Sequence, residues 1–132
     1  MEQITIKELK MYLGTGLQMV STAKGKPAYN SVLKRRLKKV EILDCENINL
    51  LLFLKRKPLL KPLSDYKDIN GDAMRKDVIN TVDFLPVYEL ANGMRKLKDM
   101  PYGTIQLMAQ NHIDFQDLIS RGLAINLNEL KQ

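Results

Sequence analysis

The stretch from Lys38 to Pro62, KKVEILDCENINLLLFLKRKPLLKP, decides the predicted fold. Apolar and charged residues alternate at its start, which predicts a strand from about Lys38 to Leu43. The apolar run from Ile48 to Lys55 predicts another strand. The short polar link from Asp44 to Asn47 is suited to an antiparallel hairpin between the two. This part of the chain therefore predicts a small antiparallel sheet.

Two prolines limit what can follow the hairpin. Pro58 and Pro62 have no backbone N–H to donate to a neighbouring strand. We therefore expect the segment from Lys57 to Pro62 to be extended, either at an edge of the sheet or leaving it.

The sequence before the hairpin predicts a first strand, from Leu17 to Thr22. The turn residues from Lys24 to Pro27 would reverse the chain after it, so that the strands form a meander. The next stretch, Tyr29 to Lys39, has apolar residues at helical spacing but ends in a strand-like alternation. Helix and strand both remain open there.

The N-terminal segment predicts a short helix. Thr5 and Glu8 have the spacing of a capping box, in which each side chain bonds to the backbone N–H of the other residue. Gly14 supplies the left-handed conformation in which helices often end.

The second half of the chain predicts a loop, helices and a final strand. Ser, Asp, Asn and Gly occupy six of the ten positions from Ser64 to Ala73, which is typical of a surface loop. Helices are expected from Pro86 to Ala91, from Pro101 to about His112, and from Asp114 to Gly122. The alternation from Leu123 to Leu127 predicts a short strand that returns to the sheet.

These elements together predict an α+β protein with an N-terminal helix, a small antiparallel β-meander, and a C-terminal helical part with a short final strand. At 132 residues the chain fits a single domain, residues 1–132. Residues 1–62 would hold the helix and a basic sheet, and residues 63–132 the loop and helices.

Positive charge is concentrated in the first half of the chain. The segment from Lys24 to Lys61 has eleven lysines and arginines and three acidic residues, an excess of eight positive charges, whereas the net charge of the whole chain is +6. Such a cluster can neutralise phosphates or bind an acidic protein, or it can be a solvated face that maintains solubility. The candidate binding residues are Lys34, Arg35, Arg36, Lys38, Lys39, Lys55, Arg56 and Lys57.

No pattern in the sequence predicts a catalytic residue, a metal ligand or a cofactor site. His112, Asp114 and Asp117 could form a metal or acid–base group, but a helix end followed by a capping Asp explains them more simply. Cys45 lies between Asp44 and Glu46, which disfavour its thiolate form. Gly14-Thr15-Gly16 ends a predicted helix instead of opening one, unlike a phosphate-binding loop, and Ser64-Asp65 lacks the rest of a triad.

The sequence predicts a cytoplasmic protein. A single cysteine is poorly suited to an oxidising compartment. The chain has no run of about 20 apolar residues that could span a membrane. Its first residues do not form a secretory signal.

Three blocks of the sequence resemble a set of short proteins encoded by phages, prophages and mobile elements of Bacteroidetes. They are Lys10-Met11-Tyr12-Leu13-Gly14-Thr15-Gly16-Leu17, Lys57-Pro58-Leu59-Leu60-Lys61-Pro62-Leu63-Ser64-Asp65, and His112 to Leu127. The resemblance implies a phage or mobile-element lineage and no particular reaction.

We therefore expect a small non-catalytic accessory protein that acts by binding. Its partner would be nucleic acid or an acidic host protein, recognised by the basic half. A virion or assembly component that self-associates is the third class of function.

Overall fold

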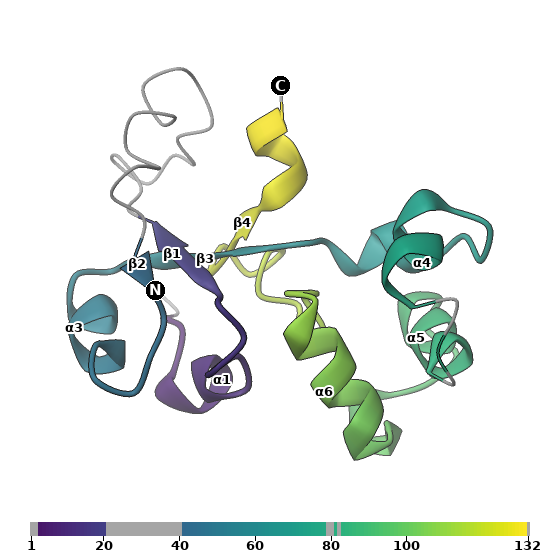
Figure 1. The fold of residues 1–132 in the computed structure, drawn as a ribbon, viewed down its shortest axis with the longest axis horizontal. Coiled ribbons are helices and arrows are strands. Elements are labelled where there is room, and N and C mark those ends of the chain that lie inside the picture. The colour runs from purple at the N-terminus through teal and green to yellow at the C-terminus, as the bar shows by residue number, and fades with distance from the viewer. Residues whose placement is uncertain (1–2, 21–40, 79–80, 82, 132) are drawn as a thin grey trace.

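The structure is a computed structural model that describes residues 3–20, 41–78, 81 and 83–131. In chain order, its helices and strands are α1 (Ile6–Lys10), β1 (Gln18–Val20), β2 (Glu41–Ile42), α3 (Ile48–Phe53), β3 (Lys57–Leu60), α4 (Asp72–Asp77), α5 (Phe84–Ala91), α6 (Tyr102–Gln110) and β4 (Ile125–Asn126). Short 3₁₀ segments cover Leu63–Tyr66, Leu97–Asp99 and Leu127–Lys131. The fold is α+β, as predicted (Figure 1).

The N-terminal helix α1 begins at the predicted capping box. The Glu8 backbone N–H donates to the Thr5 hydroxyl at 3.2 Å, and the Thr5 N–H donates to the Glu8 carboxylate at 3.0 Å. Gly14 and Gly16 then turn the chain with φ of +80° and +77°, which a side chain would strain. The predicted helix and its glycine turn are confirmed.

The described strands form a mixed sheet in the order β2-β1-β3-β4. Strand β1 pairs antiparallel with both β2 and β3, and β3 pairs parallel with β4. The predicted first and last strands are confirmed within the described residues, and β2 lies within the strand predicted from Lys38 to Leu43, whose first three residues are outside the described ranges. The meander order was wrong, because the first strand, β1, lies between β2 and β3, and the Lys38–Leu43 strand is not paired with the run from Ile48.

The run from Ile48 is a helix, so its assignment to a strand was wrong. The link before it is a capping turn: the Asp44 carboxylate accepts hydrogen bonds from the N–H groups of Glu46 and Asn47, at 2.9 and 2.8 Å. Leucine favours helix intrinsically. Ile48 and Leu51, three positions apart, are both buried, so one side of α3 faces the core.

Pro58 lies inside the sheet, not at the predicted edge. Strand β1 pairs with Lys57 and Pro58, whereas β4 pairs with Leu59 and Leu60. Each neighbour therefore covers a different half of β3. This stagger allows a proline in an internal strand, because β4 is not paired at its position.

The segment from Ser64 to Ala73 is more ordered than the predicted surface loop. Tyr66 is fully buried at the end of a 3₁₀ segment, and α4 begins at Asp72. The Tyr66 hydroxyl donates to the Asp77 carboxylate at 2.6 Å, and the Lys61 ammonium lies 3.2 Å from the same oxygen. An aromatic side chain therefore ties this segment to α4 and to the residue after β3.

Helices α5 and α6 confirm the predictions that began at Pro86 and Pro101, but the described chain from Asp114 to Gly122 forms turns and no helix. Asp117 has a φ of +61°, which interrupts helical geometry one turn after Asp114. Phe115 and Leu118 in these turns are nevertheless buried.

The main core contains residues of α1 and α3, of strands β1 and β3, and of α4, α5 and α6, so it runs along the molecule from the sheet to the helices at its other end (Figure 1). Val20, Leu59 and Ile125 form a smaller cluster with Leu127. Helix α3 lies at one end of the long axis of the molecule, and α4 and α5 lie at the other (Figure 1). Among the described residues, no helix is both long and apolar enough to cross a membrane.

Candidate binding surface

The predicted basic residues divide into two groups. Lys34, Arg35, Arg36, Lys38 and Lys39 lie outside the described residues. Lys55, Arg56 and Lys57 lie in the connection from α3 to β3. Lys55 is exposed, and the other two are partly exposed. We call these three residues the basic triplet.

Lys55 occupies a backbone position that normally belongs to glycine. Its N–H donates to the Leu52 carbonyl at 3.1 Å, and the Arg56 N–H donates to the Leu51 carbonyl at 2.9 Å. These two bonds are those of a Schellman motif, with Lys55 as the left-handed residue at φ +58°. A lysine there costs about 1–2 kcal/mol relative to glycine.

Other helix ends in the structure show why Lys55 is unusual. Gly93 occupies the same position after α5, with φ +73°. After α6 the position holds His112, with φ +57°, whose ring Nε2 lies 2.8 Å from the Thr15 carbonyl oxygen. Because a carbonyl only accepts, Nε2 carries the proton and donates this bond. The His112 side chain thus has a structural role, whereas no described residue bonds to the Lys55 side chain.

The charge of the basic triplet is also not neutralised within the described part of the chain. Arg121 lies 2.7 Å from the Glu8 carboxylate, Arg95 lies 2.9 Å from Glu89, and Lys61 is paired with Asp77. No described carboxylate forms an ion pair with the triplet. Its positive charge is therefore available to a partner.

The triplet lies beside the two points where the basic segment joins the sheet. The described chain stops at Val20, which pairs with Lys57, and resumes at Glu41, which pairs with Met19 next to Val20. In the sequence, Lys38 and Lys39 are within three residues of Glu41. The triplet therefore lies at the end of β1 where β2 begins.

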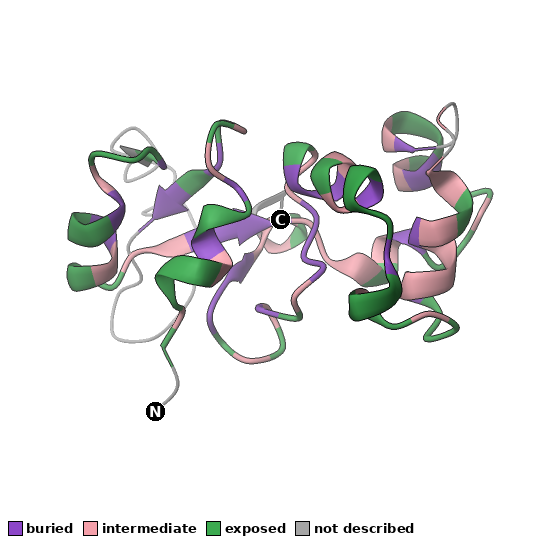
Figure 2. Cartoon of the chain, turned by 90° about the horizontal axis from the view of Figure 1, so that it is seen from below, coloured by how far each residue is buried: buried purple, intermediate pink, exposed green. Residues whose placement is uncertain are grey.

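Exposed apolar side chains precede the triplet on α3. Phe53 is 81% exposed and Leu50 is 54% exposed, and the outer turns of α3 are green at the left end of Figure 2. The sequence analysis missed them as surface residues because it assigned the run to a strand. The polar turn before Ile48 was the available signal for a helix.

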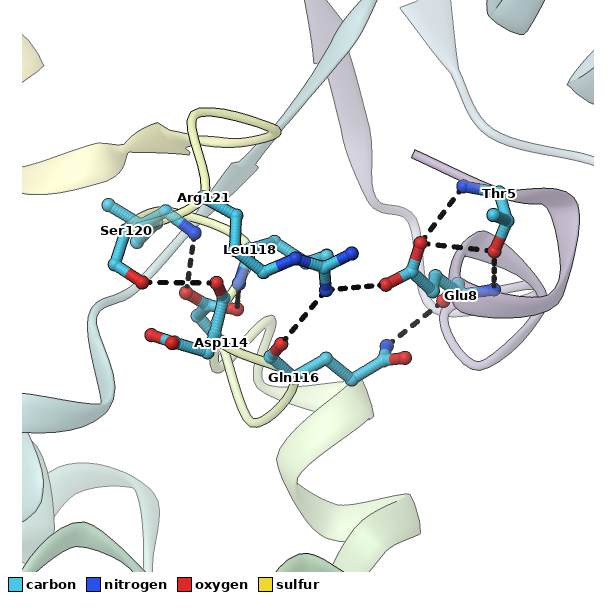
Figure 3. Close-up of polar contacts among 9 residues, drawn as sticks. Thr5, Glu8, Asp114, Gln116, Leu118, Ser120 and Arg121 are labelled. Atoms are coloured by element: carbon cyan, nitrogen blue, oxygen red, sulfur yellow. Dashed lines mark hydrogen bonds and ion pairs between the residues drawn. The ribbon is translucent and has the colours of Figure 1, made fainter. Parts of the chain in front are cut away.

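Residues that could have formed a metal or acid–base site have structural roles. The buried Asp114 carboxylate accepts hydrogen bonds from the backbone N–H groups of Leu118 and Ile119, at 2.7 and 2.8 Å (Figure 3). Burial raises the pKa of Asp114, although these two bonds oppose the rise. Within the described ranges, no group of three or more His, Cys, Asp or Glu side chains could hold a metal ion.

Cys45 and Asp65, the two remaining candidates for a reactive group, lie apart from each other in the part of the chain that the structure describes. Cys45 is exposed in the turn before α3. The Asp65 carboxylate accepts a hydrogen bond from the Asn128 side chain at 2.8 Å. Asp65 thus joins the segment after β3 to the C-terminal 3₁₀ segment.

The three sequence blocks that carry the resemblance meet at one junction. The Tyr12 hydroxyl donates to the Ile113 carbonyl at 2.7 Å, and the Lys61 and Asp114 N–H groups donate to the carbonyls of His112 and Lys61, both at 2.8 Å. Nearby, Gln116 and Arg121 reach from the turn after α6 to Glu8 on α1 (Figure 3). These blocks build the fold.

No family model, curated protein or solved structure matches this chain.

Proposed function

We propose that this chain is a small accessory protein of a phage or mobile element that acts in the bacterial cytoplasm by binding an anionic macromolecule, and not by catalysis. The basic triplet Lys55, Arg56 and Lys57 is the described part of its binding surface.

The observation that carries the proposal is the conformation of Lys55. A glycine at this left-handed position would stabilise the helix end, and the Lys55 side chain makes no described bond that compensates for the strain. Strained residues that the fold does not need are concentrated at functional sites. A requirement for its positive charge would explain why a lysine, and not a glycine, occupies this position.

The two partner classes are an acidic protein and nucleic acid. Either would be attracted by the positive charges of the triplet, and both would bind less tightly as salt screens these charges. Exposed Phe53, two residues before Lys55, is a specific observation in favour of single-stranded nucleic acid, because bases stack on aromatic side chains.

A direct test is fluorescence anisotropy with two labelled probes, a single-stranded oligonucleotide and poly-glutamate, at about 50 mM salt. The triple variant Lys55→Glu, Arg56→Glu, Lys57→Glu should lose binding by at least about tenfold. The matched control is Lys67→Glu, Lys96→Glu, Lys98→Glu, which changes the net charge equally at three exposed lysines of the other half.

The two variants separate a binding surface from general basicity. The control should bind within about threefold of the unmodified protein, because long-range net charge contributes less than direct contacts. Equal losses in both variants would reject the triplet as the binding surface. Absence of binding to both probes by the unmodified protein would reject the proposal itself.

A further inference from the structure

Helix α3 is apolar on its outward side as well as on its inward side. Ile48 and Leu51 are buried against the core, and the helical period then turns Leu50 and Phe53 toward solvent. Leu54, which caps the helix, is also exposed. Asn49 of this helix is polar and exposed, but three large apolar side chains exposed together on one side of a helix are typical of a contact surface.

Charged residues at the two ends of α3 have opposite signs. Asp44 and Glu46 are exposed in the turn before the helix, and Lys55 is exposed directly after it. A helix with this arrangement is complementary to itself when a second copy is turned by 180°, because the acidic end of each copy then meets the basic end of the other. An acidic partner would be repelled by the acidic residues before α3.

We propose that the outward side of α3 binds the same side of a second copy, with the two helices antiparallel. The twofold axis passes near Leu50, which is about midway between Glu46 and Lys55 in the sequence. Leu50 and Phe53 of the two copies pack together, and Glu46 of each copy faces Lys55 of the other. This proposal stands apart from the anion-binding function, and because both use Phe53 and Lys55, dimerisation would compete with the binding of a polyanion.

The location of α3 permits such a contact. The helix lies at one end of the long axis, and its outer turns are exposed (Figures 1 and 2). The helix has only six residues, so the contact is smaller than a standard interface. We therefore expect a weak dimer that forms as the protein concentration rises into the high micromolar range.

The first test is sedimentation velocity over a range of concentrations. The unmodified protein should show a concentration-dependent mass between monomer and dimer, and Phe53→Asp should remain monomeric. The control is Tyr102→Asp, which places the same charge at an aromatic residue that is 72% exposed on α6. A monomer at all concentrations, or equal loss of dimer in both variants, would overturn the proposal.

A charge exchange tests the self-complementary geometry. Glu46→Lys and Lys55→Glu should each weaken the dimer at least severalfold, because each places like charges opposite one another in the second copy. The double variant should recover dimerisation, since the opposite signs meet again. A double variant as weak as the single variants would reject the antiparallel arrangement.

Disulfide cross-linking provides an independent readout of orientation. Leu50→Cys, in a Cys45→Ser background, should form an intermolecular disulfide on mild oxidation, because the two residues lie beside the twofold axis. Cys45 of the unmodified protein should not, because in antiparallel helices the two copies of this residue are more than about 10 Å apart, beyond disulfide reach. Cross-linking through Cys45 alone would contradict the proposal.

Discussion

The hydroxyl of Tyr12 donates a 2.7 Å hydrogen bond to the carbonyl oxygen of Ile113, which lies 101 residues later in the chain. Both residues are fully buried, and the Tyr12 ring lies 5.4 Å from that of Phe115, measured between centroids. The pKa of Tyr12 is raised, first by burial and then by the nearby Asp114 carboxylate, so the hydroxyl remains a donor. The N-terminal segment is thus fixed to the turn after α6.

The Tyr12→Phe variant should therefore be less stable. Removing the hydroxyl takes one of two donors from the buried Ile113 carbonyl, which keeps the Phe115 N–H at 3.0 Å. The expected loss is therefore that of a single hydrogen bond, about 0.5–1.5 kcal/mol. Urea unfolding followed by circular dichroism measures the loss. Tyr102→Phe, at an exposed tyrosine, is the control and should change the stability by less than about 0.5 kcal/mol. Equal stability of Tyr12→Phe and the unmodified protein would contradict the role of this bond.

The Glu8 carboxylate should make stability depend on pH. Burial acts to raise its pKa, but the Thr5 N–H bond, Arg121 and the Thr5 hydroxyl together hold the pKa below the ordinary value of 4.5. Its contribution is therefore complete above pH 4.5 and is lost as the pH falls through the lowered pKa.

The Glu8→Gln variant should accordingly be less stable than the unmodified protein at neutral pH, and the difference should shrink below pH 4.5. Chemical denaturation at a series of pH values gives both free energies of unfolding. Glu46→Gln, which removes an exposed carboxylate, serves as the control. A difference that stays constant with pH would show that the Glu8 charge does not stabilise the fold.

The Lys55→Gly variant should be more stable but bind less tightly. Relief of the left-handed strain is worth about 1 kcal/mol, and the substitution removes one charge of the triplet. Gly93→Lys is the reciprocal control: its φ is +73° and a Cβ there would meet no atom within 4 Å, so the variant should lose about 1 kcal/mol through strain alone. Thermal unfolding and anisotropy titration measure the two properties.

Two outcomes would count against this interpretation of Lys55. A variant Lys55→Gly that gains no stability would mean that the left-handed conformation is not strained for lysine. One that gains stability and keeps its full affinity would mean that the charge at this position is not used in binding.

Local signals in the sequence were sufficient to predict a helix or strand whose defining contacts all lie within that element. Three local signals each specify a short element through its own backbone bonds. They are the capping box of Thr5 and Glu8, the proline in the first turn of α5, and the alternation around β4. The α+β class follows from these elements. They do not determine which strands become neighbours.

Tertiary packing decided the elements that the sequence analysis assigned wrongly. The run after Asn47 is apolar enough for a strand or a helix, and burial of Ile48 and Leu51 on one side selects the helix. Pro58 is tolerated in an internal strand because its two neighbours are staggered, a relation between residues that lie far apart in the sequence.

The candidate surface was only partly predictable for the same reason. The basic composition of Lys55, Arg56 and Lys57 is visible in the sequence. The left-handed conformation of Lys55 depends on α3 ending at Phe53, and so does the exposure of the helix's outer side. Assigning a strand to this run concealed both features.

The salt dependence of binding tests the central claim most directly. Each cation that contacts a phosphate of a single strand contributes about 0.7 to the slope of log affinity against log salt. For a single-stranded oligonucleotide, neutralising the triplet with Lys55→Gln, Arg56→Gln and Lys57→Gln should therefore lower this slope by up to about two. If the slope is unchanged, the triplet does not contact the bound polyanion, and the proposed binding surface is wrong.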